Sequence, residues 1–110
     1  MIHELKIWPQ YFEAVISGRK TFEIRKADRL YEVGDLLALN EYDPTEKCYT
    51  GNSCVVYVDY ILCGDKFFND GHIAMSIKPC SVLLHQEPFN HCKLTRDYSV
   101  PYATRREDDG

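Results

Sequence analysis

The spacing of apolar residues changes near Gly18, from the period of a helix to the period of a strand. Pro9 has the backbone angle preferred at the first helical position, and Gly18 can adopt the left-handed conformation that often ends a helix. Between them, four apolar residues recur on one helical face: Tyr11, Phe12, Val15 and Ile16. The sequence therefore predicts a helix over residues 9–17.

Residues 21–26 alternate with a period of two. Successive side chains of a strand point to opposite faces, so Phe22 and Ile24 share one face. The opposite face carries three polar residues: Thr21, Glu23 and Arg25. We expect a strand that presents a ladder of a hydroxyl, a carboxylate and a guanidinium.

Four further segments are predicted to be strands: residues 5–7, 36–42, 54–62 and 72–78. The run 54–62 is rich in β-branched and aromatic residues, so we expect a central strand that is apolar on both faces. Three residues of the last segment should point inward: Ile73, Met75 and Ile77. Turns are predicted at 31–35 and at 50–52, and Asp43-Pro44 should end the strand before the second turn.

Four or five strands with one early helix predict an α+β fold, a small and partly open mixed β-barrel. The chain of 110 residues is long enough for one hydrophobic core. From Leu84 onward apolar residues become sparse, and two prolines interrupt any regular pattern. We therefore expect one domain over residues 1–83 and a loosely attached or disordered C-terminal tail over residues 84–110.

The formal net charge is −4, which argues against a protein that wraps long tracts of nucleic acid. Part of this acidity comes from the end of the chain, at Glu107-Asp108-Asp109. A local basic face remains available at five residues: Arg19, Lys20, Arg25, Lys26 and Arg29. The charge thus leaves a short or nucleoside-sized ligand open.

The chain contains no apolar stretch near the roughly 18 residues that a membrane span needs. Its first residues show no export signal. Five cysteines at irregular spacings argue against a disulfide framework and are typical of a reducing compartment. We expect a cytoplasmic monomer with no membrane partner.

The polar ladder suggests a site for a polar, planar ligand. Arg25 can hold a phosphate or a base edge with two parallel hydrogen bonds, and Glu23 can accept from an exocyclic amine. Lys20 has the strand parity of Phe22, so it reaches the same face only if the backbone is irregular near Gly18. The alternative is a solvated strand face with a weak surface pair of Glu23 and Arg25.

The pattern Gly18-x-Lys20-x-x-Glu23-x-Arg25 resembles the signature of the ASCH domain, a branch of the PUA-like superfamily. Over residues 3–78 the chain is also similar to an ASCH-related bacterial and phage family of unknown function. That similarity includes the stretches at residues 3–9, 18–26 and 33–35.

The resemblance implies a PUA-like β-barrel with the early helix across one opening, and a cleft that binds RNA or a modified nucleobase. By position, Lys20, Glu23 and Arg25 would line this cleft. Thr21, from the same polar ladder, is a further ligand-binding candidate. We add two aromatic residues as stacking candidates, Trp8 and Tyr42. For Trp8 the alternative is a residue of the hydrophobic core or of a hydrophobic staple at the start of the helix.

One ASCH relative is an amidohydrolase that removes acyl groups from N4 of cytidine, with the motif Gly-x-Lys-x-x-Thr-x-Arg. In this chain Glu23 stands in place of the nucleophilic threonine, and the short connection 64–71 lacks the acidic insertion of that enzyme. The resemblance therefore favours binding. The alternative is a small metal-independent hydrolase, either an N4-acylcytidine-type amidohydrolase or a ribonuclease, with Lys20 and Glu23 as the candidate catalytic residues.

Four residues near the end of the chain are of types that bind metals: Cys80, His85, His91 and Cys92. They lack a recognised short ligand spacing. No glycine-rich phosphate loop or dinucleotide-binding pattern occurs. We expect neither a bound metal nor a cofactor.

Overall fold

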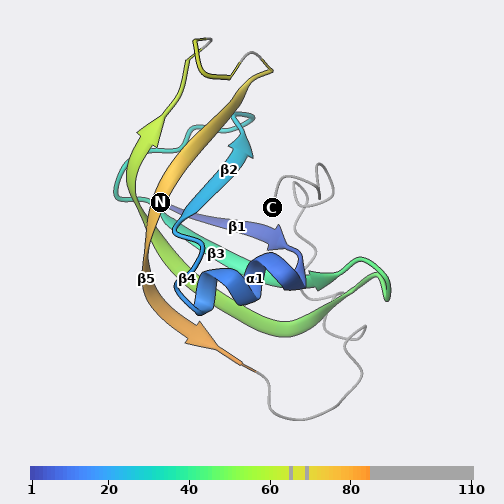
Figure 1. Ribbon diagram of the computed structural model, residues 1–110. Coiled ribbons are helices and arrows are strands. Elements are labelled where there is room, and N and C mark those ends of the chain that lie inside the picture. Colours follow the sequence, from blue (N-terminus) through green and yellow to red (C-terminus); the bar gives the residue numbers. More distant parts are fainter. Residues whose placement is uncertain (65, 69, 85–110) are drawn as a thin grey trace.

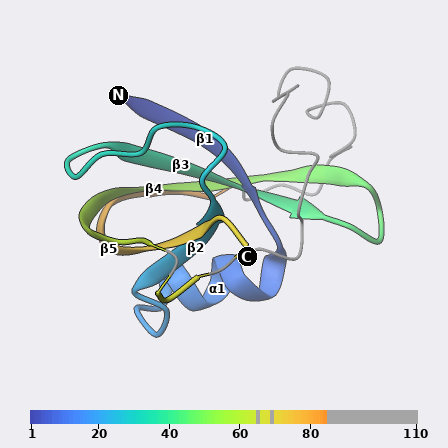
Figure 2. The same ribbon diagram turned by 90° about the horizontal axis from the view of Figure 1, so that it is seen from above.

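A curved, five-stranded mixed sheet and one helix make up the computed structural model, which describes residues 1–64, 66–68 and 70–84 (Figure 1). The elements follow in the order β1 (Ile2–Ile7), α1 (Pro9–Ile16), β2 (Phe22–Lys26), β3 (Leu36–Asp43), β4 (Cys48–Leu62) and β5 (His72–Leu83). The sheet curls into a half-barrel, as the end-on view shows (Figure 2). The predicted α+β, barrel-like fold is confirmed at this level.

The strand order is β1-β3-β4-β5-β2. β1 pairs with β3 in parallel, and the other three pairings are antiparallel. β4 is therefore the central strand, as the sequence predicted. β1 and β2 are the two outer strands, although α1 alone separates them along the chain.

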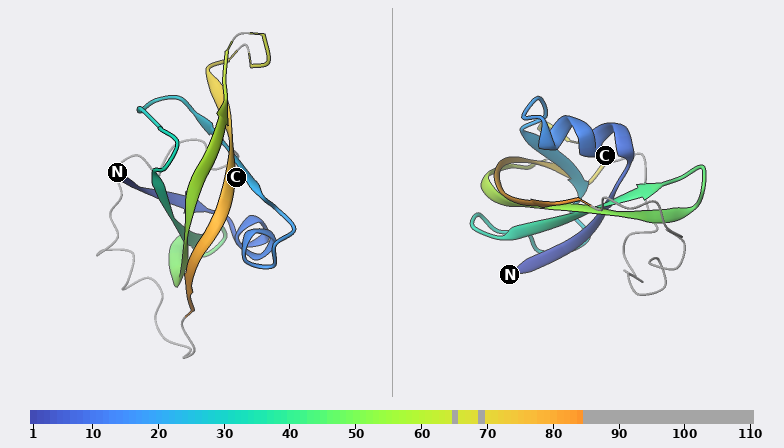
Figure 3. Two further views of the ribbon diagram at one scale, coloured as in Figure 1. Left: turned by 90° about the vertical axis from the view of Figure 1, so that its left-hand side faces the viewer. Right: turned by 90° about the horizontal axis from the view of Figure 1, so that it is seen from below.

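α1 begins at Pro9 and ends at Ile16, one residue before the predicted end. Gly18 follows with a φ of +84°, the left-handed conformation that the sequence predicted for it. The helix contacts β3, and it lies along one side of the half-barrel in the end-on views (Figures 2 and 3). It thereby carries the chain from the end of β1 to the start of β2.

The core lies on the concave face of the sheet, where every second residue of a strand points inward. Its members in the central strands include Leu37, Leu39, Val56, Val58 and Met75, each no more than 2% exposed. Burying one such side chain contributes about 1.5–3 kcal/mol. The predicted inward direction of Ile73, Met75 and Ile77 is confirmed, since all three are buried.

The turn predicted at 50–52 is wrong, because these residues lie inside β4. The β3–β4 register changes there from Asn40 opposite Ser53 to Tyr42 opposite Tyr49, so β4 contains two extra residues. A φ of +98° at Gly51 accommodates this irregularity. Glycine in a bulge and glycine in a turn give the same local signal in a sequence.

The strand predicted to end at residue 78 instead continues to residue 83. Val55 pairs with Ser81 and Val56 pairs with Pro79, so Cys80 is an extra residue in β5. Proline has no N–H to donate, and a bulge is one of the few places where a paired strand accepts it. The predicted tail lies outside the described residues from residue 85 onward, so the boundary near residue 84 stays a prediction.

Candidate functional site

Three charged side chains gather beneath β2, in the interior of the half-barrel. Glu23 is 0% exposed, and Lys20 and Arg25 are each 9% exposed. Phe22, on the opposite face of β2, is 46% exposed. The alternative of a solvated polar face is therefore wrong, because this strand turns its charged residues inward and Phe22 outward.

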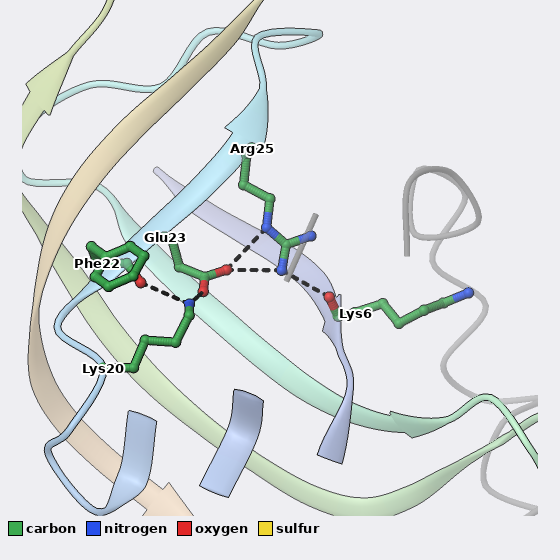
Figure 4. A network of polar contacts seen from close by, with 5 residues as sticks. All are labelled: Lys6, Lys20, Phe22, Glu23 and Arg25. Atoms are coloured by element: carbon green, nitrogen blue, oxygen red, sulfur yellow. Dashed lines mark hydrogen bonds and ion pairs between the residues drawn. The ribbon is translucent and has the colours of Figure 1, made fainter. Parts of the chain in front are cut away.

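Glu23 joins the two cations of this cluster (Figure 4). Its Oε2 accepts hydrogen bonds from Nε and Nη2 of Arg25, at 3.0 and 2.9 Å. Its Oε1 accepts from Nζ of Lys20. Both carboxylate oxygens are thus occupied by ion pairs, which are far more consequential at this depth than at a surface.

Two main-chain carbonyl groups complete the cluster. Nη2 of Arg25 donates to the carbonyl oxygen of Lys6 on β1 at 2.8 Å, and Nζ of Lys20 donates to that of Phe22 at 2.8 Å. The side chain of Lys6 points away from the cluster (Figure 4). The sequence did not indicate Lys6, because its contact is made by the main-chain carbonyl group, which every residue has.

Lys20 reaches the same buried face as Glu23 because the backbone is irregular after α1. In a regular strand its side chain would point to the opposite face, with that of Phe22. The main-chain N–H groups of Arg19 and Lys20 both donate to the carbonyl oxygen of Ala14, at 3.0 and 2.9 Å. With Gly18 in the left-handed conformation, this closing turn places Lys20 beside the end of α1. Helix termination therefore positions one of the two cations.

One amino group of Arg25 remains available to a ligand. Nη1 makes no hydrogen bond to any of the described residues, whereas Nε and Nη2 are both engaged. The side chain of Arg25 is 11% exposed, and Nη1 points away from Glu23 (Figure 4). The guanidinium is thus fixed on one edge and open on another.

Two buried groups respond to the charges of this cluster. Burial raises the pKa of the Cys54 thiol to about 12, with Glu23 adding to the increase and Lys20 opposing it. Burial also raises the pKa of Tyr31, against the opposing effects of Arg29 and Arg25. Both groups are therefore neutral near pH 7 and do not offset the charge of the cluster.

A cavity of about 110 Å³ lies on the Lys20 side of the cluster. Apolar residues such as Val56 and Pro79 form most of its lining, together with the polar residues Thr21 and Ser81. Thr21 precedes β2 and is exposed, and it does not continue the Glu23–Arg25 ladder. It therefore stands with Lys20 at the cavity and not at Arg25.

The two aromatic candidates lie apart from the ion pairs. Trp8 is half-buried at the N-cap of α1, and its Nε1 is enclosed without a hydrogen-bond partner among the described residues. Tyr42 packs edge-on against Tyr49 at 5.1 Å, and Nζ of Lys6 lies 4.0 Å from the centre of its ring. Tyr42 is thus connected to the cluster only through Lys6, so far as the described contacts show.

Other buried polar groups were not predicted, and two of them involve carboxylates. His3 Nε2 lies 2.8 Å from Asp35 Oδ2, and the same oxygen accepts from the main-chain N–H of Glu32 at 2.9 Å. Glu41 accepts from Thr50 Oγ1 at 2.7 Å and from the side-chain amide of Asn52. The parity of His3 with Leu5 and Ile7 on β1 was the available signal for the first group.

Within residues 1–64, 66–68 and 70–84, no group of three or more potential ligands is placed to hold a metal ion. Cys80 is exposed on β5, while His85, His91 and Cys92 lie outside the described residues. None of the helices described there is long and apolar enough to cross a membrane. The expectations on metal and cofactor stay predictions.

Comparisons with known proteins bear on both family and fold. A family model described as "Domain of unknown function (DUF3850)" matches residues 2–77. An "Uncharacterized 12.9 kDa protein in GpA 3'region" of Escherichia phage P2 is 51% identical over 41 residues. Those residues are 37% of this chain and 38% of that protein, so the match spans under two fifths of the length of that relative.

Among solved structures, the chain is similar to ASCH from Zymomonas mobilis, with a TM-score of 0.57 and 16% identity over 97% of this chain and 90% of that one. A serine-to-alanine variant of the same protein gives a TM-score of 0.58 at 17% identity, again over 97% and 90% of the two chains. At such low identity the likeness concerns the fold. The predicted ASCH-like fold is confirmed, whereas the wider PUA-like assignment and the signature motif stay predictions.

Proposed function

The chain belongs to the family described as domain of unknown function DUF3850, and from that premise we propose that it is a PUA-like domain that binds RNA or a modified nucleobase. The ligand contacts the buried Lys20–Glu23–Arg25 cluster. Three further residues line the binding site: Thr21, Trp8 and Tyr42. The protein acts as a cytoplasmic monomer.

The observation that carries this proposal is the open edge of Arg25. Glu23 and the Lys6 carbonyl hold two of its three nitrogen atoms, which leaves Nη1 fixed in direction and free to donate. A donor that is already ordered loses little entropy when a ligand binds. The charged N–H groups of Nη1 suit a phosphate oxygen or an acceptor on a base edge, although the two parallel hydrogen bonds expected from the sequence are not available because Nε and Nη2 are engaged.

The ASCH-like fold supports the proposal, since the resemblance to ASCH and PUA-like domains implies a cleft that binds RNA or a modified base. The cavity beside Lys20 adds a recess of mostly apolar surface, which suits the face of a base. Nucleobases are commonly recognised by stacking together with hydrogen bonds at their edges. An apolar recess and a charged donor on two sides of one cluster provide both contacts.

Glu23 acts here as an anchor for the two cations, whereas the sequence suggested that it accepts a hydrogen bond from the ligand. Both of its oxygens are already bonded to cations, so it orients Arg25 and Lys20 and does not read a donor edge itself. The same contacts weigh against the hydrolase alternative. A carboxylate whose two oxygens already accept hydrogen bonds from Lys20 and Arg25 has neither oxygen free to take a proton from a substrate or a water molecule.

The proposal is tested by fluorescence anisotropy with labelled single-stranded RNA of about ten nucleotides, at two salt concentrations and without metal. We expect wild-type protein to bind, and Arg25→Gln to weaken binding at least about tenfold through the loss of one charged hydrogen bond. Lys66→Gln removes the same charge from an exposed loop position and should bind like the wild type. Equal binding by wild type and Arg25→Gln contradicts the proposal.

A parallel incubation with RNA and with N4-acetylcytidine, analysed by chromatography, separates binding from catalysis. Binding without product supports the proposed function. Product formation that both Lys20→Met and Glu23→Gln abolish establishes the hydrolase instead.

A further inference from the structure

The buried cluster carries more positive than negative charge. Lys20 and Arg25 contribute two positive charges, and Glu23 contributes one negative charge. Arg29 and Asp28 also lie close enough to affect the neighbouring Tyr31 electrostatically. Their opposite charges form a pair at 3.8 Å and offset each other, so they add no net charge. The contacts described for the cluster therefore leave an excess of one positive charge.

An excess charge at this depth has a direct energetic consequence. All three residues are at least nine-tenths buried, so water screens their charges poorly. A buried charge without a counter-charge destabilises the folded protein. An anion that enters at the open edge of the cluster removes this imbalance, whereas a neutral ligand does not.

From this imbalance we infer that the ligand binds through a phosphate group, a conclusion that rests on the proposed function. A phosphate oxygen accepts a hydrogen bond from Nη1 of Arg25, the donor that the protein leaves unoccupied. A guanidinium N–H forms a strong, charge-assisted hydrogen bond with a phosphate oxygen. The site therefore selects nucleotides over nucleosides, and the charge on Glu23 limits the affinity that it reaches.

Isothermal titration with three ligands tests this inference: cytidine, cytidine monophosphate, and the dinucleotide CpC. We expect the monophosphate to bind at least about tenfold more tightly than cytidine, the effect of one charged hydrogen bond. Its advantage should fall with added salt and disappear in Arg25→Gln. CpC separates the two sources of phosphate: binding like the monophosphate indicates the RNA backbone, and weaker binding indicates a terminal phosphate.

Glu23→Gln gives a sharper result, because it raises the excess charge of the cluster from one to two while keeping a similar shape. We expect tighter binding of the monophosphate than in wild type. Asp59→Asn makes the same charge change at an exposed position of β4 and should leave the affinity unchanged. Circular dichroism and thermal unfolding establish that each variant is folded before titration.

The two possible failures are distinct. If cytidine and its monophosphate bind equally well, the phosphate inference is overturned and the proposed function stands. If no RNA, nucleoside or nucleotide binds, both are overturned. Thermal unfolding with inorganic phosphate provides a second readout, since phosphate should raise the melting temperature of the wild type more than that of Arg25→Gln.

Discussion

Arg25 donates a hydrogen bond from Nη2 to the main-chain carbonyl of Lys6, and this 2.8 Å contact joins the two outer strands of the sheet. β1 and β2 lie at opposite ends of the strand order and do not pair with each other. A side chain thus spans the open side of the half-barrel at this point. The residue that we propose as a donor to the ligand therefore also connects the two outer strands of the sheet.

Arg25→Ala should therefore destabilise the protein as well as weaken binding. The substitution leaves Glu23 Oε2 without the two hydrogen bonds that Arg25 donates, and it removes the donor to the Lys6 carbonyl. We expect a loss of about 3 kcal/mol in the free energy of unfolding, because buried acceptors lose their donors, and urea denaturation measures it. Arg25→Lys keeps the positive charge, but a single ammonium group cannot bond to both Glu23 and the Lys6 carbonyl as the guanidinium does. Its loss of unfolding free energy should be smaller than that of Arg25→Ala.

Arg19→Ala is the matched control for this experiment. Arg19 pairs with Glu13 at the surface, where their side chains are 66% and 60% exposed. An exposed ion pair contributes about 0–1 kcal/mol. A loss in Arg19→Ala as large as that in Arg25→Ala would show that burial of the cluster does not determine its effect on stability.

Replacing all three charged residues with apolar ones should destabilise the protein less than removing Arg25 alone. The triple variant Lys20→Met, Glu23→Leu, Arg25→Met removes every charge together and fills similar volume with apolar groups. Replacing a buried ion pair in this way is often neutral or stabilising. Arg25→Ala instead leaves the buried Glu23 carboxylate without two of its hydrogen bonds. We expect the triple variant to unfold at a urea concentration no lower than Arg25→Ala does, and to bind no nucleotide. Unfolding well below Arg25→Ala would mean that the charges are needed for the fold itself.

Much of the fold follows from the period of the sequence, because the helix, the central strand and the inward residues of β5 all depend on local alternation. The bulges in β4 and β5 could not be predicted in the same way. Thr50-Gly51-Asn52 has the composition of a turn, and only its pairing with β3 shows that the strand continues through it. Register depends on neighbouring strands, which a single local pattern does not contain.

For the candidate site, the sequence brought together the right side chains but could not orient them. Alternation placed Glu23 and Arg25 on one face of β2, yet it did not show that this face is the buried one. Lys20 depended on the backbone after Gly18, which the left-handed conformation of that residue now explains. Trp8 and Tyr42 were chosen by residue type alone, and the structure places neither in contact with the ion pairs.

The stability of the protein should decrease in acid through Asp35. Burial raises the pKa of this carboxyl, but hydrogen bonds from His3, from the main chain of Glu32 and from the amino group of Met1 outweigh it, so the pKa is lowered. A lowered pKa means that the stabilisation is complete above the pKa of the unfolded chain, near 3.9, and is lost as the pH falls through the folded value.

Asp35→Asn measures this contribution. At pH 7 we expect the variant to be about 1–3 kcal/mol less stable than the wild type, since a charged acceptor of several hydrogen bonds is removed. Below about pH 4 the difference should shrink, because the wild-type carboxyl becomes protonated as well. Urea denaturation at pH 7, 5 and 3 provides the comparison, and a difference that stays constant across this range would exclude Asp35 as the source.

Cys54 should resist thiol reagents in the folded protein although it lies next to the candidate site. It is 2% exposed, and burial raises its pKa to about 12, so the reactive thiolate is scarce at pH 8. Cys63 and Cys80 are exposed and should react quickly with iodoacetamide. Peptide mass spectrometry after brief labelling should find these two modified and Cys54 unmodified until urea is added. Labelling of Cys54 at the rate of Cys80 in the native protein would show that the wall of the cavity beside Lys20 opens to solvent.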